Sequence, residues 1–178
     1  MLEFILAVPG RRYTDFLALL QPFHATHCQG AEDEVHGETE WHGLRLIIAH
    51  NPITAAEKGV KRDRRIAELE QQAQQWCGQL DAQDAGTRTR GRKLSDGGAR
   101  ARFYQAVCEA HLGRIIRVDL SSERFNYTID EHALRHARLM DGKLLWVTNT
   151  PDLTPREVVS RYQSLADIER GFRVLKSE

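Results

Sequence analysis

The sequence predicts a mixed α/β fold from three kinds of pattern. Short apolar runs bounded by turn residues are typical of buried strands, and residues 143–148 form such a run. Residues 123–130 alternate apolar and polar side chains, as a half-buried strand does. Apolar residues at intervals of three and four are typical of a helix with one buried face. The residues with that spacing are Ile66, Leu69, Ala73 and Trp76.

Two strands and two helices are expected in the first half of the chain. Residues 3–8 read as a strand, and residues 14–20 read as a short helix with Thr14 as its cap. A second strand covers residues 44–49. A long helix follows, from about 54 to 80, and it contains the apolar stripe described above.

Elements of both types also alternate in the second half. Residues 99–111 and 131–140 are expected to be helical. Residues 123–130 and 143–148 are expected to be strands. The chain is then expected to end in one continuous helix over residues 154–176.

The start of that last helix has three matching signals. Thr154 is a good N-cap, Pro155 suits the first helical position, and Glu157 stands three residues beyond the cap. The apolar residues of the helix have helical spacing, so we expect them to face inward. They are Val158, Leu165, Ile168, Phe172 and Leu175.

Composition indicates an ordinary domain without a membrane span. The chain has 178 residues, 41% of them hydrophobic and 28% charged, and its formal net charge is zero. The length suits one domain, and the zero charge gives no global electrostatic case for nucleic-acid binding. The sequence has no apolar run of about 18 residues and no signal-peptide pattern. The three cysteines, Cys28, Cys77 and Cys108, fit a reducing cytoplasm.

Basic residues are concentrated in two stretches. The first, residues 58–65, lies on the long helix, where a solvated face is the favoured interpretation. The second lies in and after a Gly/Thr/Ser-rich tract, residues 84–98, that reads as a mobile loop. This loop either tracks DNA phosphates or is a solvated linker, and the two alternatives stay open. Its basic residues are Arg88, Arg90, Arg92 and Lys93, and Arg100 and Arg102 follow it.

Several potential metal ligands and carboxylates are interpreted as structural. One group matches no usual zinc spacing and is read as scattered loop residues. Its members are His24, His27, Cys28, His36 and His42. His132 and His136 lie one turn apart and are read as an exposed pair on a helix. Three aspartates beside predicted strands are read as strand-end and turn residues, and they are Asp119, Asp130 and Asp141.

The last helix carries an unusual stripe of polar side chains. Glu169 lies seven positions after Tyr162, and Lys176 lies fourteen positions after it. At 100° per residue these offsets nearly complete two and four turns, so the three residues project from one face. An amphipathic surface helix with ordinary ion pairs, such as Glu169 with Arg173, is the alternative interpretation.

The stripe and its flanks resemble the Tyr-x2-Arg-x3-Glu-x6-Lys signature of DDE transposases from bacterial insertion sequences. The flanking match includes Ile168-Glu169-Arg170-Gly171-Phe172-Arg173 and the lead-in over residues 141–150. One position departs from the signature, because Leu165 stands where the family has arginine. Leu165 therefore has no phosphate-contact role.

The resemblance implies a partial ribonuclease H-like (integrase-like) core, a mixed sheet flanked by helices, with an inserted α+β segment. Residues 1–38 would hold the core strand and helix that follow the second catalytic aspartate. Residues 39–140 would be the insertion-like segment. Residues 141–178 would hold the core strand and the signature helix with the catalytic glutamate. Both aspartates of the triad would precede this chain, so we interpret it as an internal piece of a transposase, inactive alone.

The resemblance also implies the chemistry. Glu169 would be catalytic, the third carboxylate that holds Mg²⁺ or Mn²⁺ for DNA strand cleavage and transfer. The DNA-binding residues would be Tyr162, Lys176, Arg173, Arg170 and Arg161. The partners would be insertion-sequence ends and target DNA, and a homo-oligomer remains open. The alternative function is a non-catalytic nucleic-acid-binding or regulatory remnant of a transposase.

Overall fold

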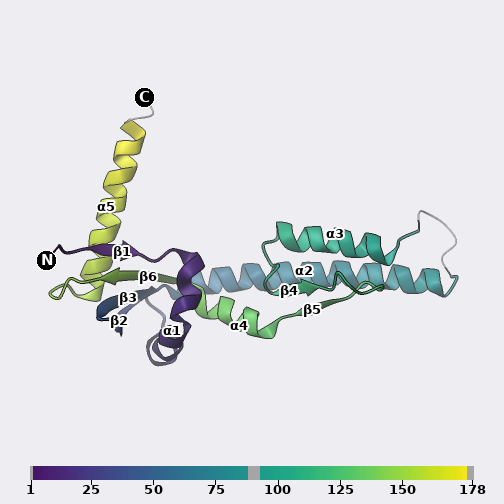
Figure 1. Ribbon diagram of the computed structural model, residues 1–178, viewed down its shortest axis with the longest axis horizontal. Coiled ribbons are helices and arrows are strands. Elements are labelled where there is room, and N and C mark those ends of the chain that lie inside the picture. The colour runs from purple at the N-terminus through teal and green to yellow at the C-terminus, as the bar shows by residue number, and fades with distance from the viewer. Residues whose placement is uncertain (1, 88–92, 176–178) are drawn as a thin grey trace. The chain divides into compact units, whose positions relative to one another are not determined.

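The computed structural model describes residues 2–87 and 93–175, and it describes side chains in the last helix as far as residue 168. The fold is mixed α/β, as the sequence predicts. The chain divides into two compact units. We call residues 1–57 and 139–178 the sheet unit, and residues 58–138 the central unit. Figure 1 labels the elements of both.

The sheet unit is built on a four-stranded sheet in the order β1-β6-β3-β2. All three described strand pairs are antiparallel. A mixed sheet also needs a parallel pair, and the described strands contain none. In the centre, Ile47 lies opposite Trp146 and Leu46 opposite Val147. The strands are β1 (Ile5–Ala7), β2 (Val35–Trp41), β3 (Leu44–His50) and β6 (Lys143–Thr148).

Helices pack on both faces of this sheet, because alternate residues of β3 are buried on opposite sides. Leu46 and Ile48 pack with residues 10–23. That segment comprises a 3₁₀-helix (Gly10–Phe16) and α1 (Leu17–Phe23). Ile47 and Ala49 pack instead with the start of α5 (Pro155–Leu175). Burial on both faces explains why residues 46–49 of β3 are all apolar.

Two details of the first forty residues differ from expectation. Thr14 does not cap a helix, because it lies inside the 3₁₀-helix that begins after Pro9. Strand β2 was not expected over its full length, and it joins β3 through a two-residue turn. His42 and Gly43 in that turn have φ values of 51° and 75°, the positive pair that a type I′ hairpin requires.

The central unit contains two long helices and a small hairpin. Its elements are α2 (Pro52–Asp84, which begins in the sheet unit), α3 (Asp96–Glu109), β4 (Ile116–Val118), β5 (Tyr127–Ile129) and α4 (Glu131–Met140). The stripe on α2 is buried as predicted at Ile66, Leu69 and Ala73. Phe103 of α3 lies at the middle of an aromatic cluster, with its ring centroid 5.4 Å from Phe125.

Strand β4 was not expected, and it pairs antiparallel with β5. Among the described helices, none combines the length and the apolar composition needed to cross a bilayer.

Candidate functional site

The start of α5 is fixed by a capping box, as the sequence predicts. The Glu157 backbone N–H donates to Thr154 Oγ1 at 3.3 Å, and the Thr154 backbone N–H donates to Glu157 Oε2 at 2.8 Å. The backbone N–H and the hydroxyl of Thr154 both donate to the Glu157 carboxylate, and together with the charge of Arg161 they lower the pKa of Glu157. The cap ties the first turn of α5 to the loop that follows β6.

The first two turns of α5 are anchored to the sheet. Val158 and Val159 are 0% and 3% exposed, and they pack against Ile47 and Trp146. Tyr162 is half-buried one turn further on, and its ring lies edge-on to Trp146 with centroids 5.9 Å apart. The sheet therefore fixes the position of Tyr162.

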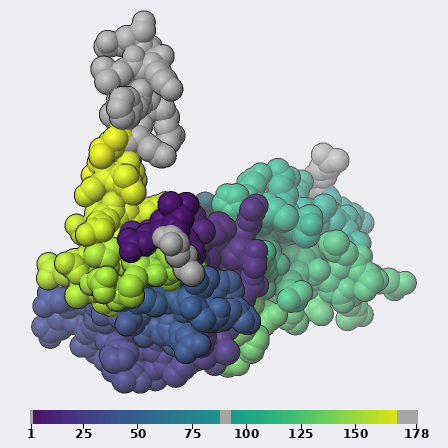
Figure 2. Space-filling view, turned by 60° about the vertical axis from the view of Figure 1, so that its left-hand side comes forward, coloured from purple at the N-terminus to yellow at the C-terminus, as the bar shows by residue number. Residues whose placement is uncertain are grey.

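Beyond Tyr162 the helix leaves the sheet, as the yellow segment shows in Figures 1 and 2. Leu165 and Ile168 are 60% and 56% exposed, so the prediction that they face inward is wrong. The reason is direction, because α5 runs across the strands and continues past β1, the edge strand of the described sheet (Figure 1). No described strand lies beneath that part of the helix. Val158 faces inward as predicted.

The remaining predicted site residues fall at the edge of the described chain. Arg161 is exposed. Glu169, Arg170 and Arg173 belong to α5, but their side chains lie outside the described residues, as do those of Phe172 and Leu175. Lys176 lies outside the described residues altogether.

A pocket of about 500 Å³ opens beside Tyr162, between α5 and strands β1 and β6. Aromatic and polar side chains share its lining, and they include Tyr13, Trp146, Tyr162, Gln163 and Asp167. The indole N–H of Trp146 is buried and has no hydrogen-bond partner among the described residues. Tyr13 Oη accepts from the Leu145 backbone N–H at 3.3 Å, and burial raises the pKa of Tyr13.

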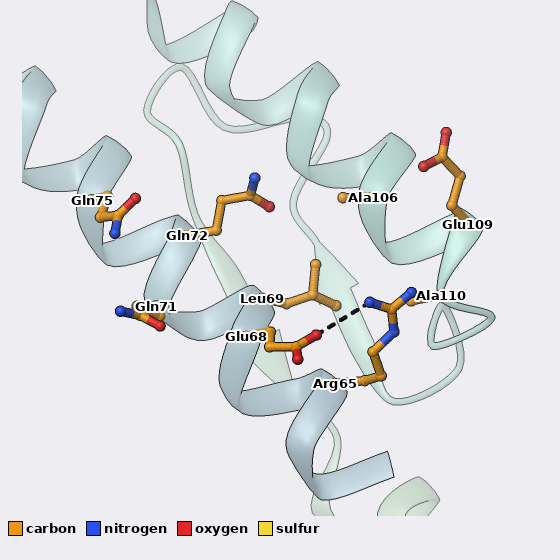
Figure 3. Close-up of a pocket in the computed structure, with 9 residues that line it drawn as sticks. All are labelled: Arg65, Glu68, Leu69, Gln71, Gln72, Gln75, Ala106, Glu109 and Ala110. Atoms are coloured by element: carbon orange, nitrogen blue, oxygen red, sulfur yellow. Dashed lines mark hydrogen bonds and ion pairs between the residues drawn. The ribbon is translucent and has the colours of Figure 1, made fainter. Parts of the chain in front are cut away.

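Two arginines of the first basic stretch pair with a carboxylate of their own helix, which agrees with the solvated-face interpretation. Arg64 and Arg65 both bond to Glu68, at 3.1 and 3.2 Å, and these bonds lower the pKa of that carboxyl. Arg65 and Glu68 line a polar groove of about 430 Å³ between α2 and α3 (Figure 3). In the second stretch, residues 88–92, and with them Arg88, Arg90 and Arg92, lie outside the described residues.

Two of the aspartates beside strands have the local roles expected of them. Asp119 accepts from the backbone N–H groups of Ser121 and Ser122 at 2.9 and 3.1 Å, which makes a turn. Asp130 precedes α4 and accepts from the Ala133 N–H at 3.0 Å. Asp141 is buried in the turn between α4 and β6.

One cluster of potential ligands was missed by the sequence analysis. The side chains of His24, Cys28 and His50 offer ligand atoms that all lie within 4.8 Å of one another. His24 and Cys28 are four residues apart on one helical turn, a spacing visible in the sequence. His50 reaches them only because β3 ends beside that turn, and no local pattern signals this contact. Of the wider group read as scattered, His27, His36 and His42 lie outside the cluster.

Comparisons with protein-family models, with curated proteins and with solved structures give no match for this chain.

Proposed function

We propose that the chain carries the glutamate-bearing part of a DDE transposase, an enzyme that cleaves and joins DNA strands with divalent metal. The observation that carries the proposal is the register of Tyr162, Glu169 and Lys176 along the signature segment. The uninterrupted helix α5 supports it, because positions 162 and 169 then fall on one side of a helix, about 10 Å apart.

The fold proposal is that the sheet unit forms part of a ribonuclease H-like core. Its layered build, with helices on both faces of a sheet, supports this. Among the described strands, β1 pairs only with β6, so its other edge can accept further strands. Strands added there would supply the parallel pairing and the two aspartates that the triad needs.

In this account each residue of the signature helix has a separate task. Glu169 holds Mg²⁺ or Mn²⁺ with the two aspartates, because hard cations need several oxygen ligands. Lys176 and the arginines at 161, 170 and 173 contact DNA phosphates. Tyr162, anchored on Trp146, braces the DNA end. In this proposal the protein acts on DNA in the cytoplasm.

The test is a chimaera in which residues 1–178 replace the matching segment of a complete DDE transposase with the same signature. Strand transfer and binding of the element's ends are measured for the chimaera and for its Glu169→Gln variant. We expect the variant to lose strand transfer and keep end binding, since the amide keeps the shape and loses the charge. Glu123→Gln, an exposed carboxyl in the central unit, is the matched control. A Glu169→Gln chimaera that transfers strands as the parent does would contradict the proposal.

A further inference from the structure

A buried group of nitrogen and sulfur ligands lies in the sheet unit, apart from the residues of the signature helix. His24 and Cys28 come from the π-helical turn after α1 (His24–Cys28), and His50 is the last residue of β3. Cys28 and His50 are each 4% exposed, and His24 is half-buried. The imidazole rings of His24 and His50 meet edge to face with centroids 5.7 Å apart.

His50 is arranged as metal-binding histidines usually are. Its Nδ1 is buried and has no hydrogen-bond partner among the described residues. Its ring also has a hydrogen bond to the backbone of Asp141. A ligating histidine typically donates from one nitrogen to a backbone carbonyl or carboxylate and keeps the other nitrogen for the metal.

The amine of Lys143 shares this buried environment. Lys143 is 3% exposed, and its Nζ lies 2.9 Å from His24 Nδ1 and 2.7 Å from the carbonyl oxygen of Leu139. While Lys143 is protonated, it donates to the Nδ1 lone pair of His24. Coordination of a metal through Nδ1 needs that same lone pair, and coordination through Nε2 needs a proton on Nδ1. Neither mode of coordination is possible while the Lys143 ammonium donates to His24 Nδ1.

We propose that His24, Cys28 and His50 bind one thiophilic divalent cation of the zinc class, in competition with the ammonium of Lys143. Two imidazoles and one thiolate are a donor set that zinc prefers and that Mg²⁺ does not. On binding, two nitrogen–metal bonds and one sulfur–metal bond form, and water fills the fourth position. Cys28 gives its proton to solvent, and the hydrogen bond from Lys143 to His24 breaks.

The three ligand atoms need to move only a short distance to reach tetrahedral spacing around a zinc ion. Tetrahedral zinc with Zn–N near 2.0 Å and Zn–S near 2.3 Å keeps its ligand atoms about 3.3–3.6 Å apart. The three ligand atoms now lie within 4.8 Å of one another, so each pair closes by at most about 1.5 Å. The side chains can make this change by rotation, once the ammonium has left.

The experiment is a titration of the metal-free chain with Co²⁺, followed by Zn²⁺ displacement. The background carries His132→Ala and His136→Ala, which remove the histidine pair on α4 whose rings lie 4.0 Å apart. Cobalt bound to Cys28 gives a thiolate charge-transfer band, which a histidine-only site lacks. We expect one equivalent to bind with that band, and Zn²⁺ to displace it.

Four variants test the assignment, with circular dichroism as the check that each is folded. Cys28→Ser should remove the band and weaken binding about a hundredfold, whereas Cys108→Ser, at an exposed cysteine, should change neither. Lys143→Leu should strengthen binding about tenfold, because the competing positive charge is gone. Lys143→Gln, which keeps a donor for the Leu139 carbonyl, should act in the same direction. Three results would overturn the proposal. The first is absence of the band in the parent and in both Lys143 variants. The second is survival of the band in Cys28→Ser, and the third is weaker binding in both Lys143 variants.

Discussion

At the scale of single residues, Thr154 and Glu157 determine where α5 begins. The hydroxyl of Thr154 and the carboxylate of Glu157 each satisfy a backbone N–H of the first turn. Replacing an N-cap threonine by alanine usually costs about 1 kcal/mol. We expect Thr154→Ala to lower the free energy of unfolding by about that amount, measured by chemical denaturation.

The charge of Glu157 adds a pH-dependent part to this cap. Bonds from Thr154 depress the folded-state pKa of Glu157, so the stabilisation is present above the unfolded pKa and is lost as pH falls through the folded pKa. Wild type should therefore exceed Glu157→Gln in stability at neutral pH, and the difference should vanish in acid. A difference that stays constant from neutral to acid pH would show that the charge has no part in the cap.

At the scale of elements, α5 has an anchored start and an exposed continuation. Val158→Ala should cost about 1–3 kcal/mol of stability, because it opens a cavity against the sheet. Leu165→Gln should stay within about 0.5 kcal/mol of wild type, because Leu165 is mostly exposed. Thermal or denaturant unfolding measures both. A large loss for Leu165→Gln would mean that this part of the helix is covered in solution.

The basic residues expected between positions 84 and 98 give a second prediction at this scale. Neutralising about four DNA phosphates gives a slope of about −3.6 for log affinity against log salt. If the loop tracks the DNA backbone, replacing Arg88, Arg90, Arg92 and Lys93 by alanine should flatten that slope. An unchanged slope would identify the loop as a linker, and would favour the basic residues of the last helix as the DNA contacts.

The elements that could be predicted from sequence are those whose pattern is local. Strands β3 and β6 are apolar runs buried on both faces, and α2 shows its buried stripe directly. Strand β2 is half-exposed and rich in acidic residues, so its pairing depends on the His42-Gly43 turn and on β3. Exposure of Leu165 could not be predicted, because periodicity gives the direction of a side chain and not the extent of the sheet beneath it.

At the scale of the whole molecule, the two candidate sites differ in how far the sequence predicts them. The signature residues are read from one helix, whereas the His24, Cys28 and His50 group depends on where β3 ends in three dimensions. Such a contact between distant segments leaves no periodic signal in a single sequence. The burial of Lys143 beside it is likewise a product of the tertiary fold.

The isolated chain is expected to lack DNA-cleaving activity. One carboxylate holds Mg²⁺ weakly, because the ion needs several oxygens in near-octahedral order. The purified chain should therefore bind DNA weakly, without sequence preference, and should not nick it in Mg²⁺ or Mn²⁺. Metal-dependent nicking that disappears in Glu169→Gln would require the other ligands to come from within the chain.

If Glu169 binds the catalytic metal, as we claim, then replacing it should change which metal supports strand transfer. In the transposase chimaera, Glu169→Cys replaces a hard oxygen ligand by a thiolate, which Mg²⁺ accepts poorly and Mn²⁺ accepts better. We expect the variant to lose strand transfer in Mg²⁺ by about a thousandfold, the equivalent of roughly 4 kcal/mol, and to regain much of it in Mn²⁺. Equal strand transfer by Glu169→Cys in the two metals, at the level of the parent, would contradict the claim.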